Sequence, residues 1–552
     1  MDLKKLRLAV KQLHLGSSTP TYNYGEMVST PINPAHVEQK ASLRFVAVAL
    51  VVVFAATHGW ALLSWNALYW DDWSILTSNT AELHRMFKFV GFEMAGTVHA
   101  WFVPLGAGVY KVVLLISLAL MSACVFLLAR SYSLTSEQAG WITALFIVAP
   151  LNTSKIAAVN VAAVLLAAIF FLAWLLLIRD LNKPSLLQRI VVLGLFSVAF
   201  YLPSSLAFFA MPAMSIVWHA YRSSRHWRQR FAVLFRRADF LLLPFVQFFI
   251  FRFFFFKPHA SIANEYQKFG IRSSRLQEAV DRLQTDFLLD MPWAVRIVLI
   301  ALPLMFVLRV TKRPQTQHTE AVGCADTWTL LGMSSCFFAL LPYLAVGRLP
   351  VFSDWNSRYH LFLPLGFALV CWGVSQYIAA YTKRTWLGIG TYGLILTLSA
   401  GFSVRSYFEY SDDWRKQVQL MAALKDQKFI QASDNIVIAD FVVYAKRREL
   451  RYYEYTQMMR HVQPGWHGLA LSNAQLQNVG GGSLKRYLGS LGGIENVQAN
   501  PELFGLSGNW QWNDSCVVLV AYESDDRVQI ERVRDQAPAH ESCVLPALIT
   551  HP

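Results

Sequence analysis

Long apolar runs alternate with short polar segments along most of this 552-residue chain. The runs fall at about residues 42–64, 104–129, 139–152, 156–178, 190–203, 205–219, 239–256, 292–309, 327–346, 359–380 and 386–403. A helix needs roughly 20 apolar residues to cross the hydrocarbon core of a bilayer. The pattern predicts a polytopic α-helical membrane protein with about 11 transmembrane helices. Continuous rather than alternating runs argue against a membrane β-barrel.

Composition agrees with a membrane protein. Hydrophobic residues make up 55% of the chain and charged residues only 15%, whereas a soluble domain carries about 25% charged residues. The net charge is +14, but the basic residues are scattered over short loops between apolar runs. Such scattering is typical of cytoplasmic loops near anionic lipids, so we expect no nucleic-acid partner.

The distribution of basic residues also predicts the orientation. One alternating set of loops carries Arg130, Arg179, Lys183, Arg189, Arg222, Arg225, Arg228, Arg230, Arg236, Arg237, Arg309, Lys312, Arg313, Lys383 and Arg384. Placing that set in the cytoplasm puts the N-terminus inside. The loops 65–103, 257–291 and 347–358, and everything after residue 404, then lie outside. We expect the bacterial inner (plasma) membrane, with the endoplasmic reticulum membrane as the alternative.

Three regions follow from this orientation. Residues 1–40 form a cytoplasmic N-terminal segment, and residues 41–404 form the transmembrane domain with its outer loops. Residues 405–552 contain two short apolar runs, at 435–440 and 516–521, that are typical of buried strands. They predict a small extracytoplasmic α/β domain. In the first outer loop, Leu83, Met86, Phe87, Val90 and Met94 recur at helical spacing and predict a helix on the membrane surface.

The strongest candidate for chemistry is Trp70-Asp71-Asp72-Trp73, just after the first apolar run. Two adjacent carboxylates at a membrane surface are costly to desolvate. Flanking tryptophans are typical of the headgroup level, so we expect the pair at a fixed depth. Asp71 or Asp72 could deprotonate an acceptor hydroxyl or help to bind a divalent cation, Mg²⁺ or Mn²⁺. The alternative is a helix cap or a solvated turn.

Other outer segments supply candidates for substrate binding. Arginine matches phosphate oxygens with a planar fork, and basic residues near a helix end lie at the depth of a lipid phosphate. Each residue has a simpler interpretation as a surface group or as an interfacial anchor that extends its charge into water. The candidates are His84, Glu93 and His99 in the first outer loop, Arg252 and Lys257 at the end of the seventh run, and Arg348, Arg358, Tyr359 and His360 in the turn that leads into the tenth run.

The acidic pair Asp71-Asp72 in the first large outer loop, the surface helix, about 11 crossings and the outer C-terminal region together resemble the GT-C superfamily. These are integral membrane glycosyltransferases that use polyprenyl-phosphate-linked sugars. Weaker support comes from Arg348 and from Ser357-Arg358-Tyr359-His360. The resemblance implies that Asp71 or Asp72 is the catalytic base or lies near the metal. It also implies that Arg358, His360 or Arg348 binds the donor phosphate. No Trp-Trp-Asp-Tyr-Gly motif occurs, which argues against an oligosaccharyltransferase.

The sequence therefore predicts a glycosyltransferase that moves a hexosyl or pentosyl group, with inversion, from a polyprenyl-phosphate donor to a glycan or lipid acceptor outside the membrane. Its place would be in polysaccharide biosynthesis at the cell envelope. Three alternatives stay open: a glycan polymerase or ligase of another membrane fold, a glycolipid transporter or flippase, and a non-enzymatic scaffold. The donor sugar, the acceptor and the oligomeric state do not follow from the sequence.

Overall fold

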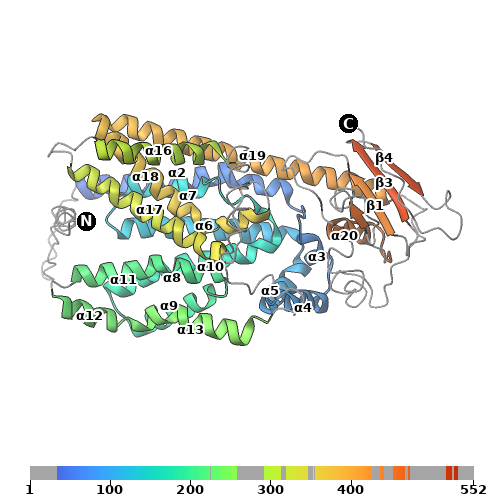
Figure 1. Ribbon diagram of the computed structural model, residues 1–552, viewed down its shortest axis with the longest axis horizontal. Helices are drawn as coiled ribbons and strands as arrows, with labels where there is room; N and C mark the ends of the chain where they lie inside the picture. Colours follow the sequence, from blue (N-terminus) through green and yellow to red (C-terminus); the bar gives the residue numbers. More distant parts are fainter. Residues whose placement is uncertain are drawn as a thin grey trace.

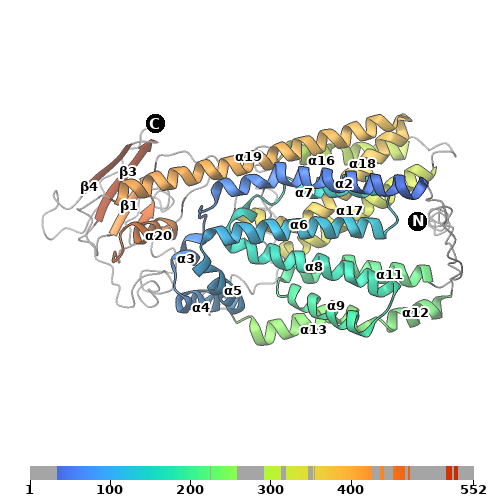
Figure 2. The same cartoon turned by 180° about the vertical axis from the view of Figure 1, so that it is seen from behind.

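The computed structural model describes residues 34–223, 226–257, 291–311, 319–345, 352, 355–425, 435–440, 450, 452–466, 470–472, 517–524 and 527–532. These residues form an elongated bundle of helices with a small sheet at one end (Figure 1). The view from behind shows the same arrangement, with the short helices α3, α4 and α5 at the same end of the bundle as the sheet (Figure 2). We call this end of the bundle the sheet end.

The first half of the chain contains α2 (Pro34–His58), η1 (Gly59–Ser64), α3 (Asp72–Thr77), α4 (Thr80–Phe89), α5 (Glu93–Phe102), η2 (Val103–Leu105), α6 (Ala107–Ser131), α7 (Ser136–Val148), η3 (Ser154–Ile156), α8 (Ala158–Asn182), α9 (Leu186–Ala199), α10 (Pro203–Phe208), α11 (Ala210–Ser223), α12 (Trp227–Phe235), α13 (Ala238–Ile250) and the π-helical turn η4 (Phe251–Phe255). The second half contains α16 (Trp293–Thr311), α17 (Thr319–Ala345), η6 (Trp355–His360), α18 (Leu363–Thr382), α19 (Thr385–Lys425) and α20 (Tyr452–Val462).

A helical membrane protein is confirmed. Seven helical stretches among the described residues are long and apolar enough to cross a membrane, at Ser42–Ser64, Ala107–Ser131, Ala158–Asn182, Ala238–Phe255, Ala325–Ala345, Leu363–Thr382 and Thr385–Lys425. Every one of the eleven apolar runs falls on a helix. The predicted count of about 11 crossings is not reached, because several of these helices are short. Helices α7, α9, α10 and α11 have 13, 14, 6 and 14 residues.

Proline explains two of the short helices. Helix α7 ends at Val148, and the next residue, Ala149, is extended with a ψ of 125° because it precedes Pro150. Pro203 occupies the first position of α10 and so ends the preceding apolar run. Helix α7 is apolar on all sides and lies inside the bundle against α2, α6, α18 and α19, where a full crossing length is not required.

The sheet has four strands, β1 (Asn435–Asp440), β2 (Ala470–Ser472), β3 (Val517–Ser524) and β4 (Arg527–Arg532), in the order β2-β1-β3-β4. Strand β1 pairs in parallel with β2 and β3, whereas β3 pairs antiparallel with β4. Helix α20 packs on the sheet. Its apolar side chains share one core with residues of β1, with the last turns of α19, and with Leu68 and Trp73 of the segment that follows η1. The sheet region and the first inter-helix segment are therefore packed together.

Candidate functional site

The Trp70-Asp71-Asp72-Trp73 motif forms a tight turn at the start of α3, at the sheet end. The N–H of Asp72 donates to the carbonyl of Tyr69 at 3.1 Å, and the N–H of Trp73 donates to the carbonyl of Trp70 at 3.3 Å. Trp70 has a φ of 52°, in the left-handed region that bulky side chains rarely adopt. Such a conformation costs on the order of 1–3 kcal/mol and persists only where the surroundings enforce it.

Both tryptophans of the motif are buried in protein, with 1% of each side chain exposed. The expectation that they lie at the lipid headgroup level was wrong. The ring of Trp70 packs edge-on against Tyr410 of α19 at 5.8 Å. The indole N–H of Trp73 donates to Gln417 Oε1 at 3.0 Å, and its ring lies 5.9 Å from that of Trp414. The cause is the length of α19, whose 41 residues extend past the bundle and cover the turn.

Asp72 points inward and is fully buried. Its Oδ2 accepts the N–H of Tyr69 at 3.1 Å, and its Oδ1 accepts the N–H of Val159, in the first turn of α8, at 3.0 Å. A carboxylate at a helix N-terminus satisfies free N–H groups and complements the helix dipole. Asp72 thereby caps α8 from another part of the chain.

The electrostatics of Asp72 match this structural role. Burial raises the pKa of Asp72 to about 6, against the lowering effects of the Lys111 ammonium and of the surrounding backbone N–H groups. Lys111 is itself buried and donates to the carbonyl of Ile156 at 2.6 Å. Both oxygens of Asp72 are occupied by N–H donors, so this carboxylate is poorly placed to take a proton from a substrate.

Asp71 differs from its neighbour. Its side chain is half-exposed and makes no capping hydrogen bond at the start of α3, although its carbonyl accepts the N–H of Ile75 at 3.0 Å. The turn therefore directs one carboxylate into the protein and leaves the other accessible. Of the two predicted catalytic residues, Asp71 is the one whose carboxylate is accessible from the surface.

The first outer loop forms two short helices, α4 and α5, rather than one. Asn79 and Glu82 form a capping box that starts α4. His84 is half-exposed, and Glu93, in the first turn of α5, is exposed. His99 is buried: it stacks on Phe87 at 5.0 Å and its Nδ1 lies 3.1 Å from the Tyr110 hydroxyl.

Burial lowers the pKa of His99 to about 4, so its ring is neutral at pH 7. This ring packs in the core between α4, α5 and α6, which disfavours the predicted part of His99 in a metal or acceptor site. His84 and Glu93 stay available at the surface. Helical spacing predicted that a helix forms here, but it could not distinguish a buried histidine from an exposed one.

The second predicted cluster lies on η6. His360 is buried, and its Nδ1 lies 2.8 Å from the carbonyl of Leu151. Burial lowers the pKa of His360 to about 4. The ring is therefore neutral at pH 7 and cannot supply charge to a phosphate, contrary to the sequence-based expectation. Arg358 is half-buried: its Nη2 donates to the Tyr359 hydroxyl at 3.0 Å and its guanidinium stacks on that ring at 4.8 Å. Arg348 lies outside the described residues.

The end of α13 is the third predicted cluster. Arg252 lies on the π-helical turn η4, and Lys257 is exposed two residues after that turn. The rings of Phe251 and Phe256 lie 6.3 and 5.3 Å from that of Phe92. This segment therefore packs on the link between α4 and α5, which brings it to the sheet end as the sequence analysis expected.

One connector, residues 149–157 between α7 and α8, joins the α3 turn to η6. Asp72 binds the N–H of Val159, just past the connector, and the Ser357 hydroxyl accepts the N–H of Ser154 at 2.9 Å. Five residues of extended chain span at most about 18 Å, and part of this stretch is coiled as η3. The two turns are therefore anchored at one end of the bundle, to backbone positions that lie within about 18 Å of each other.

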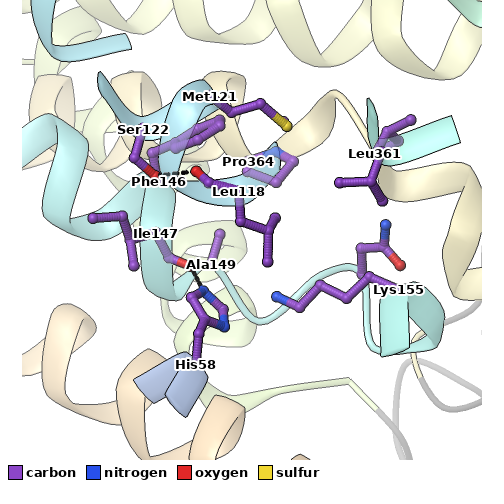
Figure 3. A pocket seen from close by; sticks show the side chains of 12 residues that line it. His58, Leu118, Met121, Ser122, Phe146, Ile147, Ala149, Lys155, Leu361 and Pro364 are labelled. Atoms are coloured by element: carbon purple, nitrogen blue, oxygen red, sulfur yellow. Dashed lines mark hydrogen bonds between the residues drawn. The ribbon is translucent and has the colours of Figure 1, made fainter. Parts of the chain in front are cut away.

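A cavity of about 30 Å³ lies beside the same connector. Its polar lining comes from His58, Ser122, Asn152 and Lys155, and the rest of its wall is apolar. Lys155 extends its amino group into this space toward His58 (Figure 3). Such a volume holds about one water molecule, or one oxygen atom of a larger polar group.

Lys155 was not among the residues predicted from the sequence. Its side chain is half-buried, and no described residue accepts a hydrogen bond from its ammonium. Burial lowers the pKa of Lys155 to about 8, so the ammonium keeps its proton at pH 7. The signal in the sequence was the polar stretch Asn152-Thr-Ser-Lys155 between two long apolar runs, where a lysine has few reasons to point inward.

The predicted divalent cation finds little support in the geometry. Among the described residues, no group of three or more His, Cys, Asp or Glu side chains is arranged to bind a metal. Asp72 cannot act as a free co-ligand of Asp71, because backbone N–H groups occupy both of its oxygens. The donor set does not fit a two-aspartate cation site.

Comparison with known proteins adds no identification. No protein-family model matches the chain, and no curated protein is significantly similar to it.

Proposed function

We propose that this protein is an integral membrane glycosyltransferase of the GT-C type, which transfers a sugar from a polyprenyl-phosphate donor to a hydroxyl of a glycan or lipid acceptor. The observation that carries the proposal is that the two aspartates of the α3 turn differ in burial. A buried Asp72 anchors the turn to α8, and a strained, fully enclosed Trp70 holds Asp71 half-exposed beside it. Strain of this kind is concentrated at functional sites in proteins.

The proposal places the sheet end outside the cell. The loops rich in lysine and arginine, such as those at the ends of α6, α8 and α18, lie at the opposite end of the bundle. An excess of such residues marks cytoplasmic loops. Nucleotide sugars are cytoplasmic, so a transferase with its acidic residue outside needs a donor that is carried in the membrane. The bacterial inner membrane is the proposed location, and the sheet with α20 is the proposed extracytoplasmic α/β domain.

The mechanism is a single displacement. Asp71 accepts the proton of the acceptor hydroxyl while the hydroxyl oxygen bonds to the anomeric carbon of the donor. The bond from that carbon to the phosphate oxygen breaks at the same time, and polyprenyl phosphate leaves with the bonding electrons. Attack opposite to the leaving group inverts the anomeric configuration.

Two cations serve the departing phosphate in this proposal. Lys155 receives one phosphate oxygen in the cavity beside the connector, and Arg358, half-buried on η6, faces the same end of the bundle. Fixed positive charge aimed at a developing negative charge is a large contribution to catalysis. The predicted divalent cation is a separate expectation, and no step here depends on it.

The test is a transfer assay with purified protein in lipid nanodiscs. Polyprenyl-phosphate hexoses and pentoses, radiolabelled in the sugar, are offered with an envelope glycan and lipid extract as acceptor. We expect transfer from at least one donor and a loss of about 100- to 10,000-fold in Asp71→Asn, the range of a general base. Glu137→Gln, an exposed carboxylate at the start of α7, is the matched control and should retain activity.

The alternatives have distinct outcomes. Full transfer in Asp71→Asn with loss in Arg358→Ala would replace the proposal by a polymerase or ligase that depends on the η6 turn. Movement of labelled lipid across the bilayer without transfer would indicate a flippase. No effect of either variant on any of these measurements would leave a scaffold.

A further inference from the structure

Helix α20 lies between the sheet and the α3 turn, although it follows that turn by almost 400 residues (Figure 1). One side of α20 packs on the sheet. Met458 and Met459 are fully buried in the core that includes Ile436 and Ile438 of β1. The Thr456 hydroxyl accepts the N–H of Ala470 on β2 at 3.0 Å.

The other side of α20 contacts α3 with polar groups. Glu454, Gln457 and His461 follow one another at spacings of three and four residues, so they share a face of the helix. Gln457 Oε1 accepts a hydrogen bond from the Thr77 hydroxyl at 2.8 Å. The His461 ring lies 6.2 Å from that of Trp73. Glu454 Oε2 accepts the N–H of Trp70 at 3.1 Å.

The Glu454 contact is unusual because of where it acts. Glu454 is fully buried, and a buried carboxylate is costly unless its hydrogen bonds compensate. Its partner is the backbone N–H of the one residue of the motif that adopts the left-handed conformation. The next residue in the chain is Asp71. This N–H belongs to the peptide group between Tyr69 and Trp70. A hydrogen bond to it fixes the orientation of that peptide and so the direction in which the backbone continues through Trp70 to Asp71.

We propose that Glu454 is a positioning residue for Asp71, and that α20 thereby makes the C-terminal region part of the catalytic site. Glu454 holds Trp70 in its strained conformation from the side opposite to the bundle, while Tyr410 and Asp72 hold the turn from the bundle side. This inference rests on the proposed function, because it takes Asp71 as the group that acts on the substrate.

The test compares three variants of the full chain. Glu454→Ala removes the acceptor, Glu454→Gln keeps an acceptor oxygen in the same place, and Gln457→Ala breaks the neighbouring contact between α20 and α3 without touching Trp70. Transfer is measured with the polyprenyl-phosphate donor that is active in the assay above. Hydrogen exchange is measured over residues 68–77.

Glu454→Ala is expected to lower kcat by about 100-fold, the effect of a displacement of about 1 Å at a reacting group. Its KM for the donor should change little, and amide exchange over residues 68–77 should increase. Glu454→Gln should restore both kcat and protection, and Gln457→Ala should leave kcat almost unchanged.

Three results would overturn the inference. They are unchanged kcat and exchange in Glu454→Ala, an equal loss of kcat in Gln457→Ala, or a Glu454→Gln variant as impaired as Glu454→Ala. Failure of the proposed function is separate: there Asp71→Asn keeps full transfer, whereas exchange over residues 68–77 in Glu454→Ala still reports whether the contact holds the turn.

Discussion

The α3 turn and the η6 turn contain similar types of residue but differ in the charge of the side chain that points inward. Each places charged and aromatic residues at the sheet end of the bundle. The α3 turn was predicted to supply the catalytic carboxylate, and the η6 turn was predicted to bind the donor phosphate. In both turns one side chain points inward: Asp72 from α3 binds the first turn of α8, and His360 from η6 binds the connector that precedes α8. The accessible neighbours are Asp71 and Arg358.

The two inward-pointing side chains differ in whether they carry a charge at pH 7. Burial raises the pKa of Asp72 to about 6, and the two N–H donors and a nearby ammonium oppose this rise, so the pKa stays below 7. His360 is held by a carbonyl, and burial keeps it neutral at that pH. Position along the chain therefore predicts which turns lie at the sheet end, whereas partners from other helices decide which side chain of a turn points inward.

The largest effect is expected from a substitution that tests the different roles of Asp71 and Asp72 in the α3 turn. Asp72→Asn places an amide against backbone N–H donors and leaves Lys111 without its countercharge. We expect it to destabilise the fold by about 1–3 kcal/mol, seen as a lower melting temperature in nanodiscs. The kcat of the folded fraction should stay far above that of Asp71→Asn. A stable, inactive Asp72→Asn variant beside an active Asp71→Asn variant would reverse the assignment of the two roles.

Lys155→Gln tests the connector that joins the two turns. Loss of a hydrogen bond from a charged group costs about 1.5–3 kcal/mol, which corresponds to roughly a 10- to 100-fold higher KM for the polyprenyl-phosphate donor. Lys88→Gln, an exposed lysine on α4, is the control. An unchanged KM in Lys155→Gln would remove this lysine from the donor site.

The pH dependence of donor binding should follow Lys155. Its pKa is lowered to about 8, so the ammonium is present below pH 8 and is lost as the pH rises through that value. The donor KM should increase above about pH 8 in the wild type and should lose this dependence in Lys155→Gln. The free energy of unfolding of the free protein should increase over the same pH range in which donor binding weakens. The unfolded chain keeps this proton to about pH 10.4, and stability rises wherever the unfolded state binds more protons.

The smallest effect is expected on the η6 side. Ser357→Ala removes a hydroxyl that lies 3.0 Å from Thr153 Oγ1 and accepts the N–H of Ser154. The buried N–H left without this partner should cost about 1–3 kcal/mol of stability, measured by denaturant unfolding, with little change in kcat. Ser131→Ala, at the exposed end of α6, is the comparison. A large loss of kcat in Ser357→Ala would make η6 as important for chemistry as the α3 turn.

The sequence predicted the helices well because each apolar run is a local property. All eleven runs are helical, and the spacing of Leu83, Phe87 and their neighbours predicted a helix in the segment that forms α4 and α5. It predicted about 11 crossings, whereas seven helical stretches of the described residues are long and apolar enough to cross a membrane. Hydropathy does not reveal that a helix such as α7 can be short and enclosed by other helices.

The site was only partly predictable, for a different reason. The pair Asp71-Asp72 stood out as charge beside an apolar run, but its division into an inner and an outer carboxylate depends on Val159 and Trp70 geometry. The burial of Trp70 depends on Tyr410 and Glu454, more than 300 residues away along the chain. Contacts at such separations leave no periodic pattern.

Helix α19 fixes how far the sheet is rotated about the helix axis relative to the bundle. Its 41 residues contain no proline and span about 60 Å at 1.5 Å per residue, roughly twice the hydrocarbon thickness of a bilayer. One residue inserted near its middle would turn everything beyond it by about 100°, carrying α20 away from α3, whereas seven residues, close to two full turns, would return α20 nearly to its original azimuth. The helix therefore sets the angle of the sheet about the long axis of the bundle as well as its distance from the bundle.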